Sequence, residues 1–490
     1  MKYTPVIGLE IHVGLKTKTK MFCDSPNNPD EKHPNVNVCP ICMGHPGTLP
    51  VINEEAVKKV IMTGLALQCS IARDTFFERK NYFYPDLPKG YQISQYQKPL
   101  CEHGTLELKS GKTIRITRIH LEEDAGRLQH DKGDYSLVDY NRAGTPLMEL
   151  VTEPDFETGQ DVRDFATEFQ LILRYVGASD ADMEKGLMRV EVNISLSNPD
   201  GSYGTKVEIK NLNSISAAAA AVDFEIERQG KALDAGEKII QETRGWDDVK
   251  KATFSQRSKE EAHDYRYFPE PDLPPLTFSD ADIDEIRGRL PELPAQRRQR
   301  FARQYGLPAA DIELFALDKP LGNFFEHAAS ELLSFENLRH LERPAAEHIE
   351  RLYKIASNYT ITEFQKHLAE ISAEPTDTKV TPELFADLVV RVFHKQISSS
   401  AAQTVLAEMF ATGRTPEQII TEKDLAQVSD SGELAAVVQK VLEANPKAVE
   451  DLKKGKEASL KFLIGMIMRE SKGKANPNVA EELIKQTIHS

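Results

Sequence analysis

The sequence predicts an α+β fold in which a strand-rich first part, residues 1–292, is followed by an all-helical second part. Short segments that alternate polar and apolar residues dominate the first part, for example residues 8–13, 113–119 and 190–195. Clusters of Gly, Pro, Asn and Asp separate these segments, as is typical of turns between strands. From about residue 293 onward the alternation disappears, and apolar residues recur at helical spacing.

Length and composition limit the class of protein. A chain of 490 residues is longer than one typical core, so we expect two to four domains. The net charge of -15 means that any contact with nucleic acid would depend on local basic patches. No apolar run reaches the ~18 residues of a membrane span, and the first residues lack a signal sequence. Five cysteines fit a reducing compartment better than a disulfide framework, so we expect a cytoplasmic protein.

The first part also contains helical segments. In residues 161–176 the apolar residues Phe165, Phe169, Ile172 and Val176 recur at the spacing of one helix face. Residues 269–276, with four prolines, cannot form a helix and predict an extended connection. The mixture of strands and helices is the reason for predicting an α+β domain.

The second part carries clear helix start signals. Thr381 before Pro382 predicts a helix start, because threonine caps the free N–H groups and proline favours the first helical position. Thr415 and Pro416 repeat the signal after Gly413, which predicts the end of the preceding helix. We place a boundary near residue 408, which gives a helical domain over 293–407 and a tail over 408–490. Residues 446–490 hold nine Lys/Arg against six Asp/Glu, the reverse of the charge balance elsewhere.

Acidic residues and a histidine lie on the polar faces of three expected strands. Alternation places Glu10 and His12 on one face of the first strand, and Glu191 on the polar face of residues 190–195. Glu122 and Glu123 follow the third expected strand, but adjacent residues point to opposite faces unless the strand ends or bulges there. Carboxylates with one histidine suit Mg²⁺ or Mn²⁺. Each strand alone is more typical of a solvated face, so convergence of the three is the hypothesis.

Three cysteines are spaced like ligands of a structural zinc site. Cys39 and Cys42 form a CxxC pair, and Cys23 lies upstream. A fourth ligand would have to come from Asp24, His33 or His45. Three thiols without a metal explain the same residues, and the sequence leaves both interpretations open.

The loop over residues 80–96 combines four tyrosines with the charged residues Lys80, Asp86 and Lys89. Such a loop is suited to lining a polar passage or to stacking on nucleic-acid bases, whereas a packed aromatic loop is the alternative. Phosphate-binding loops are absent. GlyLysThr at 111–113 lacks the upstream glycine of a P-loop, and neither GxGxxG nor GxSxG occurs. Any ATP chemistry would therefore depend on Mg²⁺ held by carboxylates.

Several strings closely resemble one family, the GatB subunits of glutamyl/aspartyl-tRNA amidotransferases. They include GlyLeuGluIleHisVal, ArgLysAsnTyrPheTyrProAsp, TyrGlnIleSerGlnTyr, HisLeuGluGluAspAlaGly, LysValGluIleLysAsnLeuAsnSer and AspTyrArgTyrPheProGluProAspLeuPro. The resemblance runs in order through residues 6–276. It continues in ValSerAspSerGlyGluLeu (428–434) and LysGlyLysAlaAsnPro (472–477), which look like the family's YqeY-type tail. It implies a catalytic cradle domain over 1–292, a helical domain over 293–407 and a YqeY-like, tRNA-binding tail over 408–490.

The resemblance also implies an activity. In the family, ATP with Mg²⁺ phosphorylates the side-chain carboxylate of Glu-tRNA(Gln) or Asp-tRNA(Asn), and ammonia then displaces the phosphate. The amidase subunit (GatA) releases that ammonia from glutamine, and a small third subunit (GatC) completes the GatCAB heterotrimer. The chain is thus expected to be part of a ligase.

The resemblance assigns roles to individual residues. Those expected to bind Mg²⁺ and act in catalysis are Glu10, His12, Glu122, Glu123 and Glu191. Those resembling the ammonia passage are Lys80, Asp86 and Lys89, and those expected to bind tRNA are Lys453, Lys454, Lys472 and Lys474. Position 191 is Glu where the family more often has Asp, and Cys23-Asp24-Ser25 stands where zinc-bearing members have CysxCys, which leaves zinc undecided.

Two other interpretations remain. The chain would be a tRNA-binding scaffold without catalytic residues if replacement of Glu123 by glutamine left acyl-phosphate formation unchanged. The archaeal-type relative GatE carries an inserted synthetase-like domain, and the sequence has no segment left for one.

Overall fold

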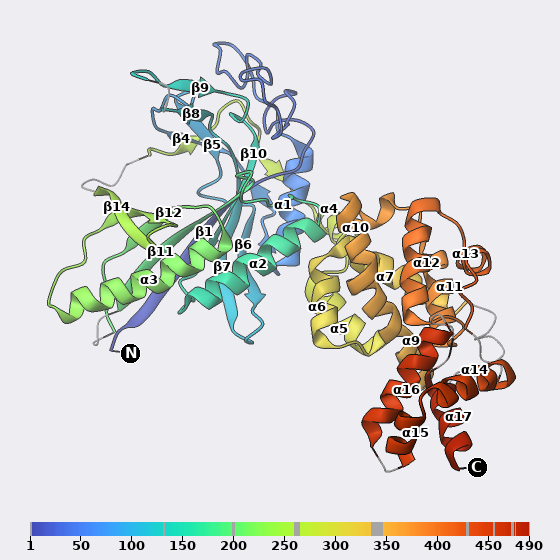
Figure 1. Ribbon diagram of the computed structural model, residues 1–490. Helices are drawn as coiled ribbons and strands as arrows, with labels where there is room; N and C mark the ends of the chain where they lie inside the picture. The colour runs from blue at the N-terminus through green and yellow to red at the C-terminus, as the bar shows by residue number, and fades with distance from the viewer. Residues whose placement is uncertain are drawn as a thin grey trace. The chain divides into compact units, whose positions relative to one another are not determined.

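The computed structural model describes residues 2–130, 133–197, 201–258, 265–334, 346–427, 431–453, 456–471, 475 and 477–489. The chain divides into two compact units, Met1–Pro294 and Ala295–Ser490. Figure 1 shows that the first unit is built on a large twisted sheet, whereas the second is helical. The prediction of an α+β fold followed by a helical region is confirmed.

The central sheet of the first unit has nine strands. Only β12 and β13 pair in parallel; the other described neighbours are antiparallel. Their order across the sheet is β14 (Ala252–Ser258), β13 (Glu242–Asp247), β12 (Val207–Leu212), β11 (Met188–Ser197), β1 (Thr4–Gly14), β10 (Pro146–Thr152), β7 (Thr113–Glu123), β6 (Cys101–Glu107) and β2 (Ser70–Ile71).

Three smaller sheets accompany the large one. They are β15 (Phe268–Pro269) with β4 (Glu78–Asn81) and β5 (Tyr91–Ser94), β16 (Leu276–Thr277) with β3 (Asp74–Thr75), and β8 (Arg127–Gln129) with β9 (Leu137–Asp139). Residues 269–276 run between β15 and β16 without a helix, as their prolines predicted.

One face of the central sheet forms the core of the unit. The helices α1 (Glu54–Ala66), α2 (Gly159–Tyr175) and α3 (Ile215–Asp234) contribute to the same hydrophobic cluster as the sheet, and α4 (Asp280–Gly288) contacts α1. Ile11 and Val13 of β1 are fully buried there with Phe165 and Phe169 of α2, which confirms the helix predicted from their spacing. The alternate residues of β1 therefore face the opposite side of the sheet.

The second unit contains two separate hydrophobic cores. The first is formed by α5 (Pro294–Tyr305), α6 (Ala309–Leu317), α7 (Lys319–Leu332), α9 (Ala346–Tyr359), α10 (Gln365–Ile371), α11 (Pro382–Phe393), α12 (Ser399–Thr412) and α13 (Pro416–Glu422), with the π-helical turn η1 (Thr360–Phe364) between α9 and α10. The second is formed by α14 (Ser431–Ala444), α15 (Pro446–Lys453), α16 (Glu457–Glu470) and α17 (Pro477–His489). None of the described helices combines the length and the apolar character that crossing a membrane requires.

The helix start signals act as the sequence predicted. Thr381 accepts a hydrogen bond from the Leu384 N–H at the start of α11, and Thr415 forms a capping box with Gln418 at the start of α13. Gly413 ends α12 in the left-handed conformation, with φ of 74°. Residue 408 lies inside α12, and the described core residues change from the first cluster to the second only between Leu425 and Leu434. The division at 408 thus stays a prediction.

Candidate active site

The register of three neighbouring strands brings acids and histidines into one row. His12 in β1 lies opposite Glu149 in β10, and Glu149 lies opposite His120 in β7. Directly paired residues of antiparallel strands point to the same face of a sheet. Glu10 and Glu122 each lie two residues from a member of this row, so they share that face. We call Glu10, His12, His120, Glu122 and Glu149 the acid–histidine cluster.

Distances within the acid–histidine cluster are short. His12 Nε2 is 3.4 Å from Glu149 Oε2, and it is 3.7 Å from both Glu10 Oε1 and Glu122 Oε1. His120 Nε2 lies 3.5 Å from Glu149 Oε2 and 3.9 Å from Glu122 Oε2. Glu149 therefore lies between the two imidazoles.

Burial and mutual charge set the protonation of the cluster. Burial raises the pKa of Glu122 to about 7, and the charge of Glu149 acts in the same direction. Burial alone would lower the pKa of His12, but its hydrogen bond to Glu149 and the charge of Glu122 outweigh this and raise it to about 9. Burial lowers the pKa of His120 to about 4, so this imidazole is neutral at neutral pH. Although burial opposes ionisation of Glu149, His120 and the hydrogen bond with His12 lower its pKa.

Two overlapping groups in the cluster have the geometry of a metal site. Glu10, His12 and Glu149 form one, and His120, Glu122 and Glu149 form the other. In each group the ligand atoms lie within 4.8 Å of one another. Carboxylate oxygens with few nitrogens suit Mg²⁺ or Mn²⁺. Glu10, Glu122 and Glu149 place three carboxylates around the same imidazole, and a divalent cation would offset both their burial and their mutual repulsion. The residues present therefore fit the expected Mg²⁺.

Glu123 does not join the cluster, contrary to the sequence prediction. Regular pairing of β7 continues through Leu147–Glu122 and Pro146–Glu123, so β7 neither ends nor bulges before Glu123 and the side chain points to the other face. There its two carboxylate oxygens each lie 2.5 Å from Lys89 Nζ. The backbone N–H of Ile93 donates to it at 2.9 Å.

Glu191 lies beside the cluster. Its Cα partner in β1 is Glu10, so both side chains share the polar face. However, Glu191 Oε2 is 2.8 Å from Lys210 Nζ, and Glu191 is in neither metal-binding group. A direct ligand role for Glu191 therefore remains a prediction.

Sequence reasoning missed two members of the cluster, His120 and Glu149. His120 lies two residues before Glu122, so alternation alone would have placed both on one face. The neighbours of Glu149 in the sequence are apolar, and Met148 and Leu150 are fully buried. The sequence around Glu149 therefore gave no signal of a polar site. Only the pairing of β10 with β1 and β7 places it at the centre.

The three residues expected to line a passage lie in different surroundings. Lys80 in β4 is near the cluster: burial would lower its pKa, but the charges of Glu122 and Glu149 raise it. Lys89 pairs with Glu123 on the other face. Asp86 is half-buried, and its backbone carbonyl accepts the Gly126 N–H at 2.8 Å. Burial raises the pKa of its carboxyl group; the charge of Asp124 adds to this rise and that of Arg142 opposes it.

The Lys89–Glu123 pair and the cysteines line the same cavity. This cavity has a volume of about 230 Å³, and its lining includes Cys23, Cys42, Lys89, Glu123 and Gly144. Gly144 has φ of +82°, and a Cβ there would lie 3.4 Å from Cys42 Cβ and 3.8 Å from Glu123 Oε2. Both distances are ordinary van der Waals contacts, so the left-handed backbone conformation and not a lack of space favours glycine at this turn.

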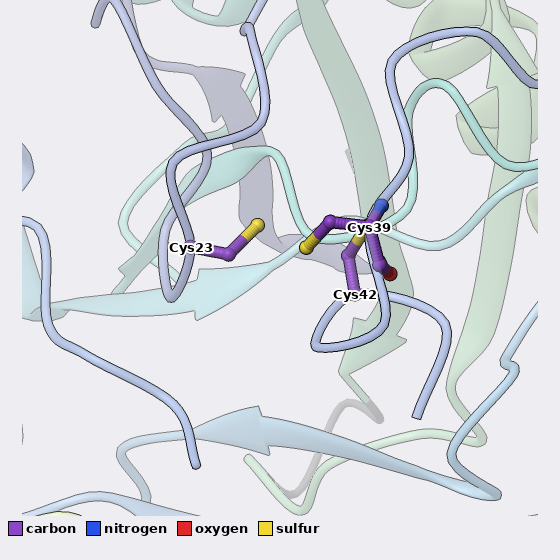
Figure 2. A group of neighbouring side chains, drawn as sticks. All are labelled: Cys23, Cys39 and Cys42. Atoms are coloured by element: carbon purple, nitrogen blue, oxygen red, sulfur yellow. The ribbon is translucent and has the colours of Figure 1, made fainter. Parts of the chain in front are cut away.

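The three cysteines converge as the sequence predicted. Figure 2 shows the sulfur of Cys23 directed toward Cys39 and Cys42. The three sulfurs lie within 4.8 Å of one another. The hydrogen bond from the Cys23 S–H lowers the pKa of Cys42, and the Cys39 N–H, 3.1 Å from the Cys42 sulfur, acts in the same direction.

None of the candidates for a fourth zinc ligand completes the cysteine group. Asp24, His33 and His45 are all described, yet none places a ligand atom within 4.8 Å of all three sulfurs. His33 is exposed and instead lies 3.0 Å from Glu31. The structure therefore does not bring a fourth ligand from these residues to the cysteines, and zinc binding here stays a prediction.

Comparison with known families decides what the chain is related to. The sequence profile of the GatB/GatE catalytic domain matches residues 5–284, which include the whole acid–histidine cluster. The chain belongs to the GatB family. The profile of a second region, the GatB domain, matches residues 343–488.

Relatives of known identity match this GatB chain over its full length. The B subunit of the aspartyl/glutamyl-tRNA(Asn/Gln) amidotransferase of Caldanaerobacter subterraneus subsp. tengcongensis is 46% identical, with 100% of both chains covered. The same subunit of Thermotoga maritima is 46% identical, with 100% of this chain and 99% of the relative covered. That of Carboxydothermus hydrogenoformans is also 46% identical, with 99% of each chain covered. This coverage leaves no room for the inserted domain expected of GatE.

In the tail of this GatB chain, one of the four lysines expected to bind tRNA is described. Lys453 is an exposed residue at the end of α15. Lys454, Lys472 and Lys474 lie outside the described residues.

Proposed function

We propose that this chain is the GatB subunit of a tRNA-dependent amidotransferase. In this role it phosphorylates the side-chain carboxylate of Glu-tRNA(Gln), Asp-tRNA(Asn) or both with ATP and Mg²⁺, and it then directs ammonia to the activated acid. The observation that carries the proposal is the convergence of Glu10, Glu122 and Glu149 with two histidines on one face of the central sheet. Membership of the GatB family supports the same activity.

The chemistry explains why such a cluster is needed. Hydroxide is a poor leaving group, so a carboxylate must first become an acyl phosphate before neutral ammonia can displace it. Phosphoryl transfer depends mainly on positioning and on charge stabilisation, which a divalent cation supplies when bound. Glu10, His12, Glu122 and Glu149 would hold that cation, and Lys80 would place a further positive charge beside it. The tRNA carboxylate and the ATP phosphates, all anionic, are expected to bind at this face.

We further propose that an amidase, GatA, and a small third protein, GatC, complete the enzyme. No glutaminase signature is present in the sequence, so ammonia must come from a partner. Lys80, Asp86 and Lys89, the last of which is paired with Glu123, are our candidates for the polar passage. A cytoplasmic location is part of the proposal, because aminoacylated tRNA is its substrate.

A reconstitution with GatA and GatC tests the proposal. Misacylated tRNA(Gln) and tRNA(Asn) are each supplied with ATP and Mg²⁺, once with glutamine and once with free ammonia. The proposal expects amidation with either nitrogen source and release of phosphate from ATP. If neither nitrogen source gives an ATP-dependent product, the proposed activity is wrong. If product forms at an unchanged rate with the Glu149→Gln chain, the partners do the chemistry and the scaffold interpretation is favoured instead.

Binding of Mg²⁺ is expected to tighten as pH rises. The cation must displace protons from Glu122, whose pKa is about 7, and from His12, whose pKa is about 9. Below pH 7 we therefore expect the apparent affinity to rise about tenfold per pH unit for each proton displaced. Without the cation, Glu122 and His120 act in opposite directions between pH 4.5 and 6.5, because the folded chain retains the Glu122 proton but has lost the His120 proton. A net fall in stability is therefore expected only above about pH 6.5, where the folded chain retains the protons of Glu122 and His12 and the unfolded chain loses them.

Thermal unfolding at pH 6, 7 and 8, with Mg²⁺ or with EDTA, measures this dependence. The variant Glu122→Gln is the control, because it has no proton to release and should lose much of the dependence below pH 7. An affinity for Mg²⁺ that is the same at pH 6 and pH 8 would contradict the assigned ligands.

The tail is expected to bind tRNA through its lysines. Lys453→Glu should weaken tRNA binding about threefold and reduce the slope of log affinity against log salt by about 1, since one phosphate contact is lost. Filter binding or fluorescence anisotropy at several salt concentrations measures both quantities. Lys366→Glu, an equal charge change at an exposed residue of α10, is the control. Equal losses in the two variants would show a general charge effect and not a tail contact.

A further inference from the structure

The cysteine cluster, which we define as Cys23, Cys39 and Cys42, lacks the fourth ligand that a structural zinc ion requires. Such ions are held by four thiolate or imidazole ligands in a tetrahedron. The described residues supply three sulfurs. No carboxylate, imidazole or further thiol among them lies within 4.8 Å of all three sulfurs. Ser25 Oγ, 3.9 Å from Cys42 Sγ, offers a hydroxyl group in place of a fourth thiolate. The residues present therefore do not fit a structural zinc site.

A buried lysine supplies positive charge at the cluster. Lys20 is 1% exposed, and its Nζ lies 3.7 Å from Cys42 Sγ and 3.2 Å from the backbone carbonyl oxygen of Tyr140. Within the part of the chain that the structure describes, no carboxylate forms an ion pair with Lys20. A buried ammonium group is costly unless an anion accompanies it. The sulfur of Cys42 is the group placed to be that anion.

The backbone holds this arrangement in place. The backbone N–H of Lys20 donates to the Ser25 carbonyl at 2.9 Å. This turn brings the side chains of both residues next to the sulfur of Cys42. The Cys39 N–H donates to Cys42 Sγ at 3.1 Å. Cys42 thus has an ammonium group, a hydroxyl group and an amide N–H around its sulfur, and these three donors favour the thiolate. Among the described residues, the one acceptor that favours the thiol is the backbone carbonyl oxygen of Cys39, 3.4 Å from the sulfur.

We infer that Lys20 takes the place of a metal ion at the cysteine cluster, and that the Cys42 thiolate is a site of oxidation by small peroxides with Cys23 as the second thiol. Both cysteines line the cavity of about 230 Å³, which gives a small peroxide a route to the sulfur. This inference does not depend on the proposed tRNA chemistry.

The oxidation proceeds in two steps. The Cys42 thiolate attacks one peroxide oxygen, the S–O bond forms, the O–O bond breaks, and hydroxide leaves; sulfur is oxidised and oxygen is reduced. The Cys23 thiol then attacks the sulfenic acid, the S–S bond forms, and the hydroxyl group leaves as water with the thiol proton. The two sulfurs lie within 4.8 Å, so a small movement of the loop brings them together.

The test uses the full chain, purified without chelators. Its zinc content is measured by mass spectrometry of the metal, and its cysteines are labelled with iodoacetamide before and after treatment with hydrogen peroxide and then mapped by peptide. We expect far less than one zinc per chain, and fastest labelling at Cys42. Peroxide should produce a Cys23–Cys42 disulfide that a reducing agent reverses.

The chain provides its own controls. Cys69 and Cys101 are buried thiols without a described lysine contact, and they should label at least about tenfold more slowly than Cys42. Lys20→Met should slow labelling of Cys42 about tenfold or more, whereas Lys20→Arg, which keeps the charge, should retain most of it. Cys23→Ser should prevent the disulfide, and Cys39→Ser should not.

Two results would overturn the inference, and both are measured on the unaltered chain. The first is one zinc per chain together with protection of all three cysteines until a chelator is added. The second is labelling of Cys42 no faster than that of Cys69 and Cys101. Because neither result needs a variant, loss of folding in Lys20→Met would leave the test intact.

Discussion

Glu149→Gln is expected to abolish ATP-dependent amidation, with a loss of about a thousandfold or more in kcat, on the scale seen when a charge-stabilising group is removed from an active site. Glu149 belongs to both groups of candidate metal ligands, and it lies between His12 and His120. Glutamine keeps the size of the side chain but removes the negative charge. The variant therefore loses a ligand common to both groups.

The measurement is phosphate release from ATP in the presence of misacylated tRNA, with binding of tRNA measured in parallel. Binding should persist, because the tail lysines are unchanged. Glu102→Gln, at an exposed residue of β6 in the same sheet, is the matched control and should retain activity. Activity of Glu149→Gln within tenfold of the unaltered enzyme would rule out the cluster as the site of phosphoryl transfer.

Glu123→Gln is expected to act on stability, in contrast to the loss of acyl-phosphate formation that the sequence suggested. The side chains of Glu123 and Lys89 are 3% and 12% exposed, so the variant leaves a largely buried ammonium group without its carboxylate. Removing one partner of a buried pair costs about 3 kcal/mol of unfolding free energy, and access of water to the cavity reduces this toward about 2 kcal/mol. Phosphate release from ATP should remain within about tenfold of the unaltered enzyme, because Glu123 is outside the cluster. Glu149→Gln and not Glu123→Gln therefore separates the catalytic interpretation from the scaffold interpretation.

Urea unfolding measures the stability of three chains: the unaltered chain, Glu123→Gln and the double variant Glu123→Gln/Lys89→Met. The double variant Glu123→Gln/Lys89→Met removes both charges and should recover most of the stability that the single variant loses. If the double variant is less stable than the single one, the ion pair is not the cause. If Glu123→Gln instead abolishes phosphate release while stability is unchanged, Glu123 is catalytic after all.

The sequence by itself determined the features that depend on neighbours along the chain. Alternation along residues 8–13 correctly placed Glu10 and His12 on the face opposite Ile11 and Val13, because successive strand residues point to opposite faces. The helix over 161–176 and the starts at Thr381 and Thr415 followed from local spacing and capping. The family could also be recognised from the sequence, because the motifs that resemble GatB are continuous stretches of residues.

Only the tertiary structure decided which faces meet. His12, Glu149 and His120 come from three strands that are far apart in the sequence, and their row depends on strand order and register. The same register placed Glu123 against Lys89, since a shift of one residue moves a side chain to the other face. Likewise, the contact of Lys20 with Cys42 joins residues 22 positions apart through a folded loop. These pairings are not encoded in any local pattern, because they arise from packing between distant segments.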